Sequence, residues 1–487
     1  MIAKTAFALA ATALLVACSG GSENSSSATT RPETTQSSSI STQTSVDGES
    51  STTTAQPGVG DVLAVPGDFD TIQAAVDASL PGDVVLISPG VYHEAVNVTT
   101  DEITIRGLDR NEVVLDGAFE LDNGIRVLGA SGVAVENLTV QSYTNNGVFW
   151  TGVEGYRASY VTLYRNGDYG AYAFDSINGL LEHSYASGSR GGGFYIGQCF
   201  ECNALVDDVI AEYNGLGYFG ANSGGNLHIV NSRFNNNRAG IKVNSGTYEL
   251  CYPQRETTIV GNTVYDNNQP DTPSIRDALL VMYNGIVVEG GIGNVIERNL
   301  VADHDRVGIA VVPFVEQRPV DVEPSEETWS LPCSQTREFP LADPDDVEPI
   351  YWRPLDNRVV GNVVAESGVA DIALIAVDAD LDVIDPGELG NCFGANEFES
   401  TAPTDLEGIA PCEGVGSGGD HRIGELDYVG WFDALATAPP SMDGPDAPTP
   451  ARPVFDGMPD AATAPSSPAI GLPPSVDLAA IVVPSRP

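Results

Sequence analysis

The sequence predicts an all-β fold, a right-handed parallel β-helix with about 23 residues per coil. Three observations support this prediction. Glycine-marked segments recur at a nearly constant spacing, the runs between them alternate apolar and polar residues, and a short amphipathic helix precedes them. A fixed period of this length is typical of a solenoid, in which each coil packs only against its neighbours.

The repeat is clearest in the middle of the chain. Its segments are GIRVLG, GVFWTG, GAYAFD, GFYIGQ, GYFGAN and GIKVNS, starting at Gly124, Gly147, Gly170, Gly193, Gly217 and Gly240. Two later segments, GIVVEG at Gly285 and GIAVVP at Gly308, are again 23 residues apart. Runs such as GVAVENLTV, bounded by Gly, Asn, Ser and Asp, indicate strands and turns. A leucine-rich repeat has a similar period, but it needs Leu where this chain has Val, Ile, Ala and Phe, so three short strands per coil fit better.

A predicted helix precedes the first strands. In DTIQAAVDASLPGD, Asp70 and Gln73 form a capping-box pattern, and Ile72, Ala75 and Val76 share one helical face. We expect this helix to cover the open end of a β-helix at residues 59–378, interrupted by insertions near 246–280 and 313–355. Residues 379–487 show little periodicity and predict an irregular, Pro-rich C-terminal segment that lies along the coils or caps the far end.

The stretch TIQAAVDASLPGDVVLISPGVYHEAV, together with the coils, resembles the pectin-lyase-like superfamily of β-helix proteins over roughly two-thirds of the chain. The resemblance implies a glycan partner, since β-helix enzymes commonly bind glycans along an exposed sheet. It implies no particular activity. The Gly-His-Gly motif of polygalacturonases, the Trp-Ile-Asp-His of pectate lyases and the Asp-Pro-His-Asp of alginate epimerases are missing. The stretch ADHDR resembles the last motif superficially, and we interpret its His304 as a turn residue.

The N-terminus predicts export. An apolar run from Ala6 to Ala17 follows Lys4 and has the length of a signal-peptide core, too short to span a bilayer. The stretch LVAC resembles a bacterial lipobox, which implies a signal peptide at residues 1–18 with Cys18 as the lipidated residue. An ordinary signal peptide is the alternative. Residues 19–58 are rich in Ser and Thr and predict a disordered tether. We therefore expect an exported protein, lipid-anchored to the outer face of a bacterial membrane.

The charge limits the partners. The 67 acidic and 22 basic residues give a formal net charge of -45, which disfavours nucleic acid and leaves the lipid anchor as the contact with the membrane. We expect a monomer.

Six cysteines follow Cys18, and an even number in an exported protein favours disulfides. They are Cys199, Cys202, Cys251, Cys333, Cys392 and Cys412. Among the 15 full pairings, Cys392 with Cys412 is the preferred bridge. A metal site at CFEC is disfavoured because no second such pair accompanies it. No histidine spacing predicts a metal site, and Asp207 with Asp208 is only a weak calcium signal, so calcium stays a candidate cofactor.

Strand alternation predicts which side chains point inward and which point outward. The inward set is Ile125, Val127, Trp150, Ala173, Ile196 and Val243. The outward column is Arg126, Phe149, Tyr172, Tyr195, Phe219 and Lys242. We predict that this column is an exposed substrate-binding surface on which sugar rings lie. The alternative is that stacked side chains only stabilise the sheet.

Three charged residues near this column are candidate catalytic groups. Asp168, Asp175 and Arg190 could supply an acid, a base and a charge clamp, although each is also typical of a solvated turn. Three functions stay open: a surface polysaccharide lyase or hydrolase, a non-catalytic adhesive or structural rod, and a β-helix maturation factor of the periplasmic type. The last would need a copper-handling site, for which four Met and five His are sparse.

Overall fold

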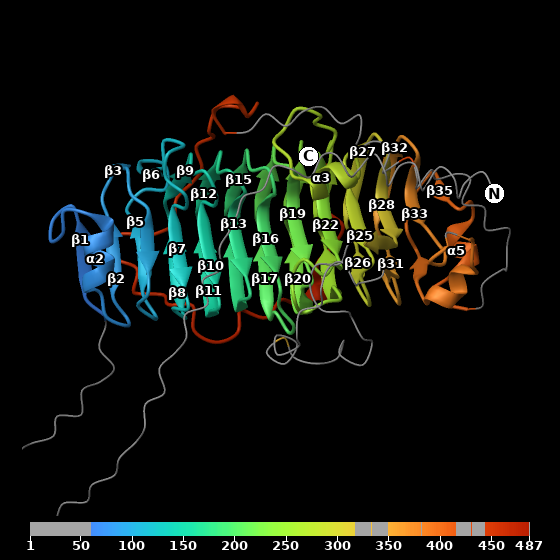
Figure 1. The fold of residues 1–487 in the computed structure, drawn as a ribbon, viewed down its shortest axis with the longest axis horizontal. Coiled ribbons are helices and arrows are strands. Elements are labelled where there is room, and N and C mark those ends of the chain that lie inside the picture. Colours follow the sequence, from blue (N-terminus) through green and yellow to red (C-terminus); the bar gives the residue numbers. More distant parts are fainter. Residues whose placement is uncertain are drawn as a thin grey trace, which may run out of the picture. The chain divides into compact units, whose positions relative to one another are not determined.

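A computed structural model describes residues 60–316, 333, 349–380, 382–414, 430 and 444–486. Residues Val59–Pro487 form one compact unit. In this unit the chain coils through three parallel sheets (Figure 1). The predicted parallel β-helix is therefore confirmed. The predicted signal peptide, its Cys18 and the predicted tether lie outside the described residues.

Three sheets, here called A, B and C, make up the wall of the solenoid. Sheet A contains β1 (Val62–Val65), β2 (Val84–Ile87), β5 (Thr104–Gly107), β8 (Val133–Glu136), β11 (Glu154–Ser159), β14 (Ile177–Glu182), β17 (Ala204–Asp207), β20 (Gly224–Val230), β23 (Arg255–Val260), β26 (Val295–Glu297), β31 (Arg358–Val360) and β34 (Cys392–Gly394). Sheet B contains β3 (Gly90–Tyr92), β6 (Val113–Asp116), β9 (Thr139–Gln141), β12 (Thr162–Tyr164), β15 (Tyr185–Ser187), β18 (Ile210–Glu212), β21 (Arg233–Asn235), β24 (Thr263–Tyr265), β27 (Leu300–His304) and β32 (Val363–Ser367). Sheet C contains β4 (Val96–Val98), β7 (Ile125–Leu128), β10 (Val148–Thr151), β13 (Tyr169–Phe174), β16 (Gly192–Gly197), β19 (Leu216–Ala221), β22 (Ala239–Asn244), β25 (Ile286–Glu289), β28 (Val307–Val312), β33 (Ala370–Leu374) and β35 (Thr401–Ala402).

Apolar side chains fill the interior of the solenoid along the strands, and asparagine side chains lie at its corners. All six predicted inward residues are fully buried in one core cluster. At one corner, Asn262 donates its backbone and side-chain N–H groups to the Asn299 side-chain oxygen at 2.9 and 3.0 Å, and Asn299 repeats these contacts with Asn362. Such ladders pair buried polar groups that would otherwise oppose folding.

Helix α2 (Ile72–Ala78) packs at the first coils, where the sequence predicts it. Its apolar face of Ile72, Ala75 and Val76 is buried. The predicted capping box is wrong, because Thr71 is the N-cap and its hydroxyl accepts the Ala74 N–H at 3.1 Å.

The insertions differ from the prediction in one respect. The interruption expected near 246–280 is two separate insertions, since β23 and β24 lie between them, and the second contains α3 (Arg276–Leu280). The later insertion carries the antiparallel pair β29 (Phe314–Glu316) and β30 (Ile350–Trp352).

The coil continues beyond residue 378, where the sequence analysis expected it to end, because β34 and β35 extend sheets A and C. A short helix, α5, spans Leu406–Ile409.

Residues 444–486 lie along the outside of the coils, which is one of the two placements that the sequence left open. Single turns of 3-10 helix occur at Gly444–Asp446 and Leu478–Ala480, and another lies earlier at Pro386–Leu389. Val476, Leu478 and Ile481 pack on a small apolar cluster of sheet A. This segment therefore carries the chain back across several coils.

Three disulfides are formed within the described residues. The predicted Cys392–Cys412 bridge is confirmed, and Cys199–Cys202 and Cys251–Cys333 are the other two pairs. Over the part of the chain that the structure describes, no helix has the length and apolar character needed to cross a membrane.

Candidate functional site

The predicted outward column of sheet C is in register. Arg126, Phe149, Tyr172, Tyr195, Phe219 and Lys242 pair successively on β7, β10, β13, β16, β19 and β22. The rings of Phe149 and Tyr172 are 5.2 Å apart, and those of Tyr172 and Tyr195 are 4.4 Å apart. Residues 23 or 24 positions apart therefore stack as the period predicts.

The prediction that the whole column is exposed is wrong. Tyr195, Phe219 and Lys242 are 0%, 2% and 0% exposed. Tyr195 and Phe219 belong to a second apolar cluster on the outer face of sheet C, which includes Ala278 and Leu280 of the insertion that contains α3. Lys242 contacts the same insertion through Asp277. The insertion covers these side chains, so they do not form a sugar platform in this structure.

Lys242 is an ion-pair partner rather than an exposed cation. Its Nζ atom lies 3.0 Å from Asp277 Oδ1 and 2.9 Å from Glu289 Oε2. Burial by itself lowers the pKa of Lys242, but Asp277 and Glu289 outweigh it and leave the pKa above its ordinary value. The lysine thus joins α3 to the end of β25.

The accessible part of the column is the N-terminal half. Phe149 and Tyr172 are partly exposed, and the Arg126 side chain is 35% exposed. Tyr169 stacks on Tyr172 with ring centroids 4.6 Å apart, which widens the aromatic surface. This smaller patch, called the aromatic patch below, is what the structure leaves of the predicted platform.

The three predicted catalytic residues do not form one site. Asp168 and Arg190 make an ion pair at the corner before β13 and β16. Asp175 immediately follows β13, so the six-residue strand separates it from Asp168 by on the order of 20 Å. Two carboxylates that cleave one glycosidic bond lie roughly 5–10 Å apart. The prediction that Asp168 and Asp175 act together is therefore wrong.

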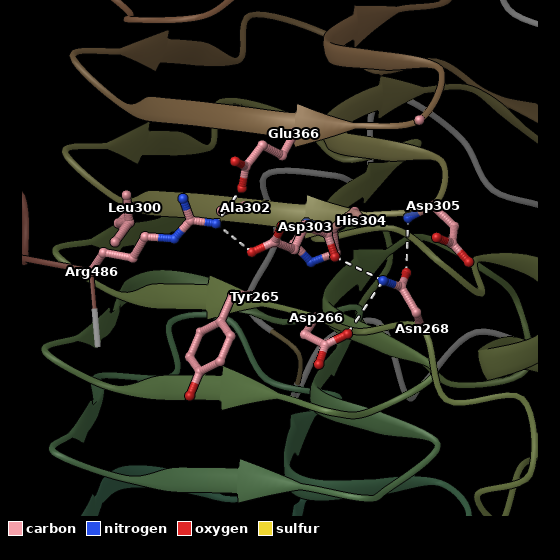
Figure 2. A pocket seen from close by; sticks show the side chains of 11 residues that line it. Tyr265, Asp266, Asn268, Leu300, Ala302, Asp303, His304, Asp305, Glu366 and Arg486 are labelled. Atoms are coloured by element: carbon pink, nitrogen blue, oxygen red, sulfur yellow. Dashed lines mark hydrogen bonds and ion pairs between the residues drawn. The ribbon is translucent and has the colours of Figure 1, made fainter.

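A different group of carboxylates lines a pocket of about 690 Å³ beside sheet B. This volume is within the usual range for small-ligand sites, about 300–1,000 Å³. Figure 2 shows its side chains, which come from the coils of β24, β27 and β32 and from the C-terminal segment. The lining residues are Tyr265, Asp266, Asn268, Leu300, Ala302, Asp303, His304, Asp305, Glu366, Gly368 and Arg486.

Three of these carboxylates occupy the same position in successive coils. Tyr265 pairs with Ala302, and Ala302 with Ala365, so Asp266, Asp303 and Glu366 follow one another at the next position. The backbone of all three residues is in the left-handed region, with φ of 51°, 58° and 60°. Neighbouring coils are about 4.8 Å apart, so the backbone stacks like charges at that spacing. We call Asp266, Asp303 and Glu366 the carboxylate column.

Asn268 connects the column to the adjoining turn. Its Nδ2 atom donates to the Asp303 carbonyl at 2.8 Å and lies 3.5 Å from Asp266 Oδ1 (Figure 2). Its side-chain oxygen accepts the Asp305 N–H at 2.8 Å. The turn thereby keeps a second aspartate, Asp305, at the same pocket.

The pKa values at the two ends of the carboxylate column are shifted in opposite directions. Burial, with additional repulsion from Asp303 and Asp305, raises the pKa of Asp266 above its ordinary value. Hydrogen bonding to Arg486 lowers the pKa of Glu366. The Arg486 guanidinium binds Asp303 at 2.5 Å and also binds Glu366 (Figure 2). One end of the column therefore favours the acid form, and the other favours the carboxylate.

His304 is not a turn residue, contrary to the prediction. It ends β27, is 1% exposed, and its Nε2 atom lies 3.1 Å from Asn267 Nδ2. It takes the corner position that asparagine has in the preceding coils, since Asn237 donates to Asn267 in the same way. Burial lowers its pKa to about 3. The imidazole is therefore neutral near pH 7, and its contact with Asn267 gives it a structural role.

The pocket was missed because insertions hide its period. Asp266, Asp303 and Glu366 are separated by 37 and 63 residues rather than 23. A shared pattern was present, however. The runs NTVYDN, NLVADH and NVVAES each place Asn at the first position, Val at the third and an acid at the fifth. Aligning them on the corner asparagine would have stacked the acids.

A metal centre is not built from these groups. Within residues 60–316 and the later described ranges, no three His, Cys, Asp or Glu side chains converge so that they could hold a metal ion. The carboxylates of the column are spread along the solenoid. Their arrangement suits proton transfer and binding of a cationic group better than chelation.

Comparison with known proteins supports the fold. A family model described as right handed beta helix region matches residues 123–313. The comparison with curated protein sequences gives no match.

Solved structures with similar coils are distant. A mannuronan C-5 epimerase A-module of Azotobacter vinelandii is 18% identical, with 68% of this chain and 92% of that chain covered and a TM-score of 0.43. An alginate lyase from Paenibacillus sp. is 13% identical, with 52% and 91% covered and a TM-score of 0.34. The enzymatically active domain of a tailspike protein from bacteriophage CBA120 is 10% identical, with 69% and 47% covered and a TM-score of 0.43. At these values the likenesses carry no argument about activity.

Proposed function

We propose that this protein is a carbohydrate-acting β-helix protein that hydrolyses a glycan bound at the carboxylate column. The observation that carries the proposal is the placement of Asp266 and Asp303 on adjacent coils, beside Tyr265, in one pocket. Glycoside hydrolysis needs two carboxyl groups at one bond, one to donate a proton and one to act as base or nucleophile. An aromatic ring beside them offers a flat surface for a sugar.

The two carboxyl groups have distinct roles in this proposal. Asp266, whose pKa is raised by burial, protonates the glycosidic oxygen as the bond to the anomeric carbon breaks. Asp303 attacks that carbon from the next coil. Adjacent coils are about 4.8 Å apart, close to the roughly 5–5.5 Å that separates the carboxyls in enzymes with a covalent glycosyl intermediate. Water then releases the sugar, with Asp266 acting as base.

The charge of the pocket favours hydrolysis over lyase chemistry. A lyase acts on an acidic sugar and needs a group that neutralises its carboxylate. Among the described residues that line the pocket, four are acidic and Arg486 is the one cation at neutral pH. A polyuronate would therefore be repelled, so we expect a neutral or cationic glycan.

The test is release of reducing ends from a polysaccharide panel by the full chain. Asp266→Asn and Asp303→Asn should each lower the rate by at least about a hundredfold, since each removes a group that acts in the transition state. Asp168→Asn, at the corner before β13, is the matched control and should retain the native rate. Native rates in both column variants would overturn the proposal.

A second candidate function is non-catalytic glycan binding, and the aromatic patch favours it. Phe149 and Tyr172 are stacked and partly exposed, with Arg126 at their edge. Phe149→Ala with Tyr172→Ala would abolish glycan binding in a pure binder, while Asp303→Asn would leave binding unchanged. Tyr195 is unsuitable for this test because its truncation would open a buried cluster.

The place of action is also a proposal. We propose that Cys18 is lipidated and anchors the exported chain, because LVAC resembles a lipobox. Cys18→Ser should move the protein from the membrane fraction to the soluble exported fraction, as measured by fractionation and immunoblotting. Stable attachment requires more than one acyl chain, since one chain binds reversibly. Unchanged membrane partition of the variant would refute lipidation as the anchor.

A further inference from the structure

The carboxylate column already contains a cationic group supplied by a remote part of the chain. Arg486 lies 183 residues from Asp303 and 120 residues from Glu366, and its guanidinium binds both. The segment that carries it is fixed to the coils. Ile481 packs in the cluster formed with Val260, and Arg298 donates to the Leu478 carbonyl at 2.6 Å. The guanidinium thus shows where a cation binds between two coils.

This contact is exposed enough to be exchanged. The side chains of Arg486, Asp303 and Glu366 are 53%, 45% and 53% exposed. Exposed ion pairs contribute little net stability, because water and salt screen them. A second cation that reaches the pocket could therefore replace the guanidinium without disrupting the buried core.

The rest of the pocket suits a sugar that carries the cation. Tyr265 lies beside Asp266, one coil away from the guanidinium, and the pocket of about 690 Å³ is much larger than one guanidinium group. A protonated amine has three donors, which is enough to bridge Asp303 and Glu366 as Arg486 does. A sugar ring bearing this amine could then contact the tyrosine face.

We propose that the carboxylate column binds the ammonium group of an amino-sugar glycan, and that Arg486 occupies this position when the glycan is absent. The inference rests on the proposed function, which it extends by naming the substrate class. It requires that the ammonium group bind Asp303 and Glu366 and displace the guanidinium. No covalent step is added.

The test compares two ligands that differ in charge. Glucosamine oligomers and N-acetylglucosamine oligomers of equal length are titrated into the full chain by calorimetry, at about pH 5.5, where free amines are protonated. The glucosamine oligomer should bind at least about tenfold more tightly, and the preference should shrink in high salt because charges are screened. Equal affinity for the two oligomers would overturn the inference.

Variants of the cation and of its partner complete the test. Arg486→Ala should tighten glucosamine-oligomer binding by about tenfold, because the internal competitor is gone. Arg486→Lys keeps the positive charge and should change affinity less than threefold. Asp303→Asn should reduce the affinity to that of the acetylated oligomer, with thermal unfolding used to verify that each variant is folded. Unchanged affinity in Arg486→Ala would refute displacement of the guanidinium.

The outcome separates this inference from the proposed function. If neutral glycans are cleaved in a manner that depends on Asp266 and Asp303, but the amine gives no preference, the hydrolase proposal stands and the amino-sugar inference fails. If glucosamine oligomers bind preferentially but no substrate is cleaved, the inference stands as a binding function and the hydrolase proposal fails. If no oligomer binds and no polysaccharide of the panel is cleaved, both are wrong.

Discussion

His304 shows how one buried residue can make the stability of the fold depend on pH. The imidazole replaces an amide in a corner ladder and accepts from Asn267, so only its neutral form fits. Burial lowers its pKa to about 3 from the ordinary 6.5. Between these two pH values the unfolded chain binds a proton that the folded chain does not. The stability contributed by neutral His304 is therefore complete above about pH 6.5 and is lost as the pH falls.

We expect His304→Asn to remove this acid sensitivity. As the pH falls from about 6.5 towards 3, a single such group lowers the free energy of unfolding by up to about 1.4 kcal/mol per pH unit. Between pH 7.5 and pH 5 the native protein should lose about 2 kcal/mol more than the variant, as measured by urea unfolding. His93→Asn, at an exposed position, is the control and should follow the native profile. Parallel profiles for His304→Asn and the native protein would contradict this account.

At the scale of elements, the coils were predictable and their coverings were not. Alternation alone placed Ile196 and Val243 in the core, because a strand that lines a solenoid must bury every second side chain. The same rule placed Phe219 outward, which is correct, but outward is not exposed when an insertion packs on the sheet. The path of the insertion that contains α3 depends on how Ala278 packs with the outward aromatic side chains of sheet C. Local sequence does not encode such contacts. The carboxylate column was missed for a different reason, because insertions break the 23-residue spacing between its members.

The insertion's ion pair gives a prediction about the energetics of sheet C. Lys242→Met should lower the free energy of unfolding by about 3–5 kcal/mol, because it leaves Glu289 buried without its cation. Arg126→Met changes a cation of the same column whose side chain is 35% exposed, and it should cost no more than about 0.5 kcal/mol. Urea unfolding of both variants measures the difference. Equal losses would show that the burial of Lys242 has no energetic consequence.

At the scale of the whole molecule, the dominant feature is the formal net charge of -45 that the full chain carries. Carboxylates repeat from coil to coil, as in Asp266 and Asp303, so mutual repulsion accumulates along the solenoid and opposes folding. We therefore expect the melting temperature to rise when NaCl is increased from about 10 mM to 150 mM, as the screening length falls from roughly 30 to 8 Å. Calcium and magnesium chlorides, compared at equal ionic strength, provide the control. Screening alone predicts the same melting temperature in both salts, whereas a higher melting temperature in calcium chloride would reveal a calcium site. A melting temperature that does not depend on NaCl would refute the role of repulsion.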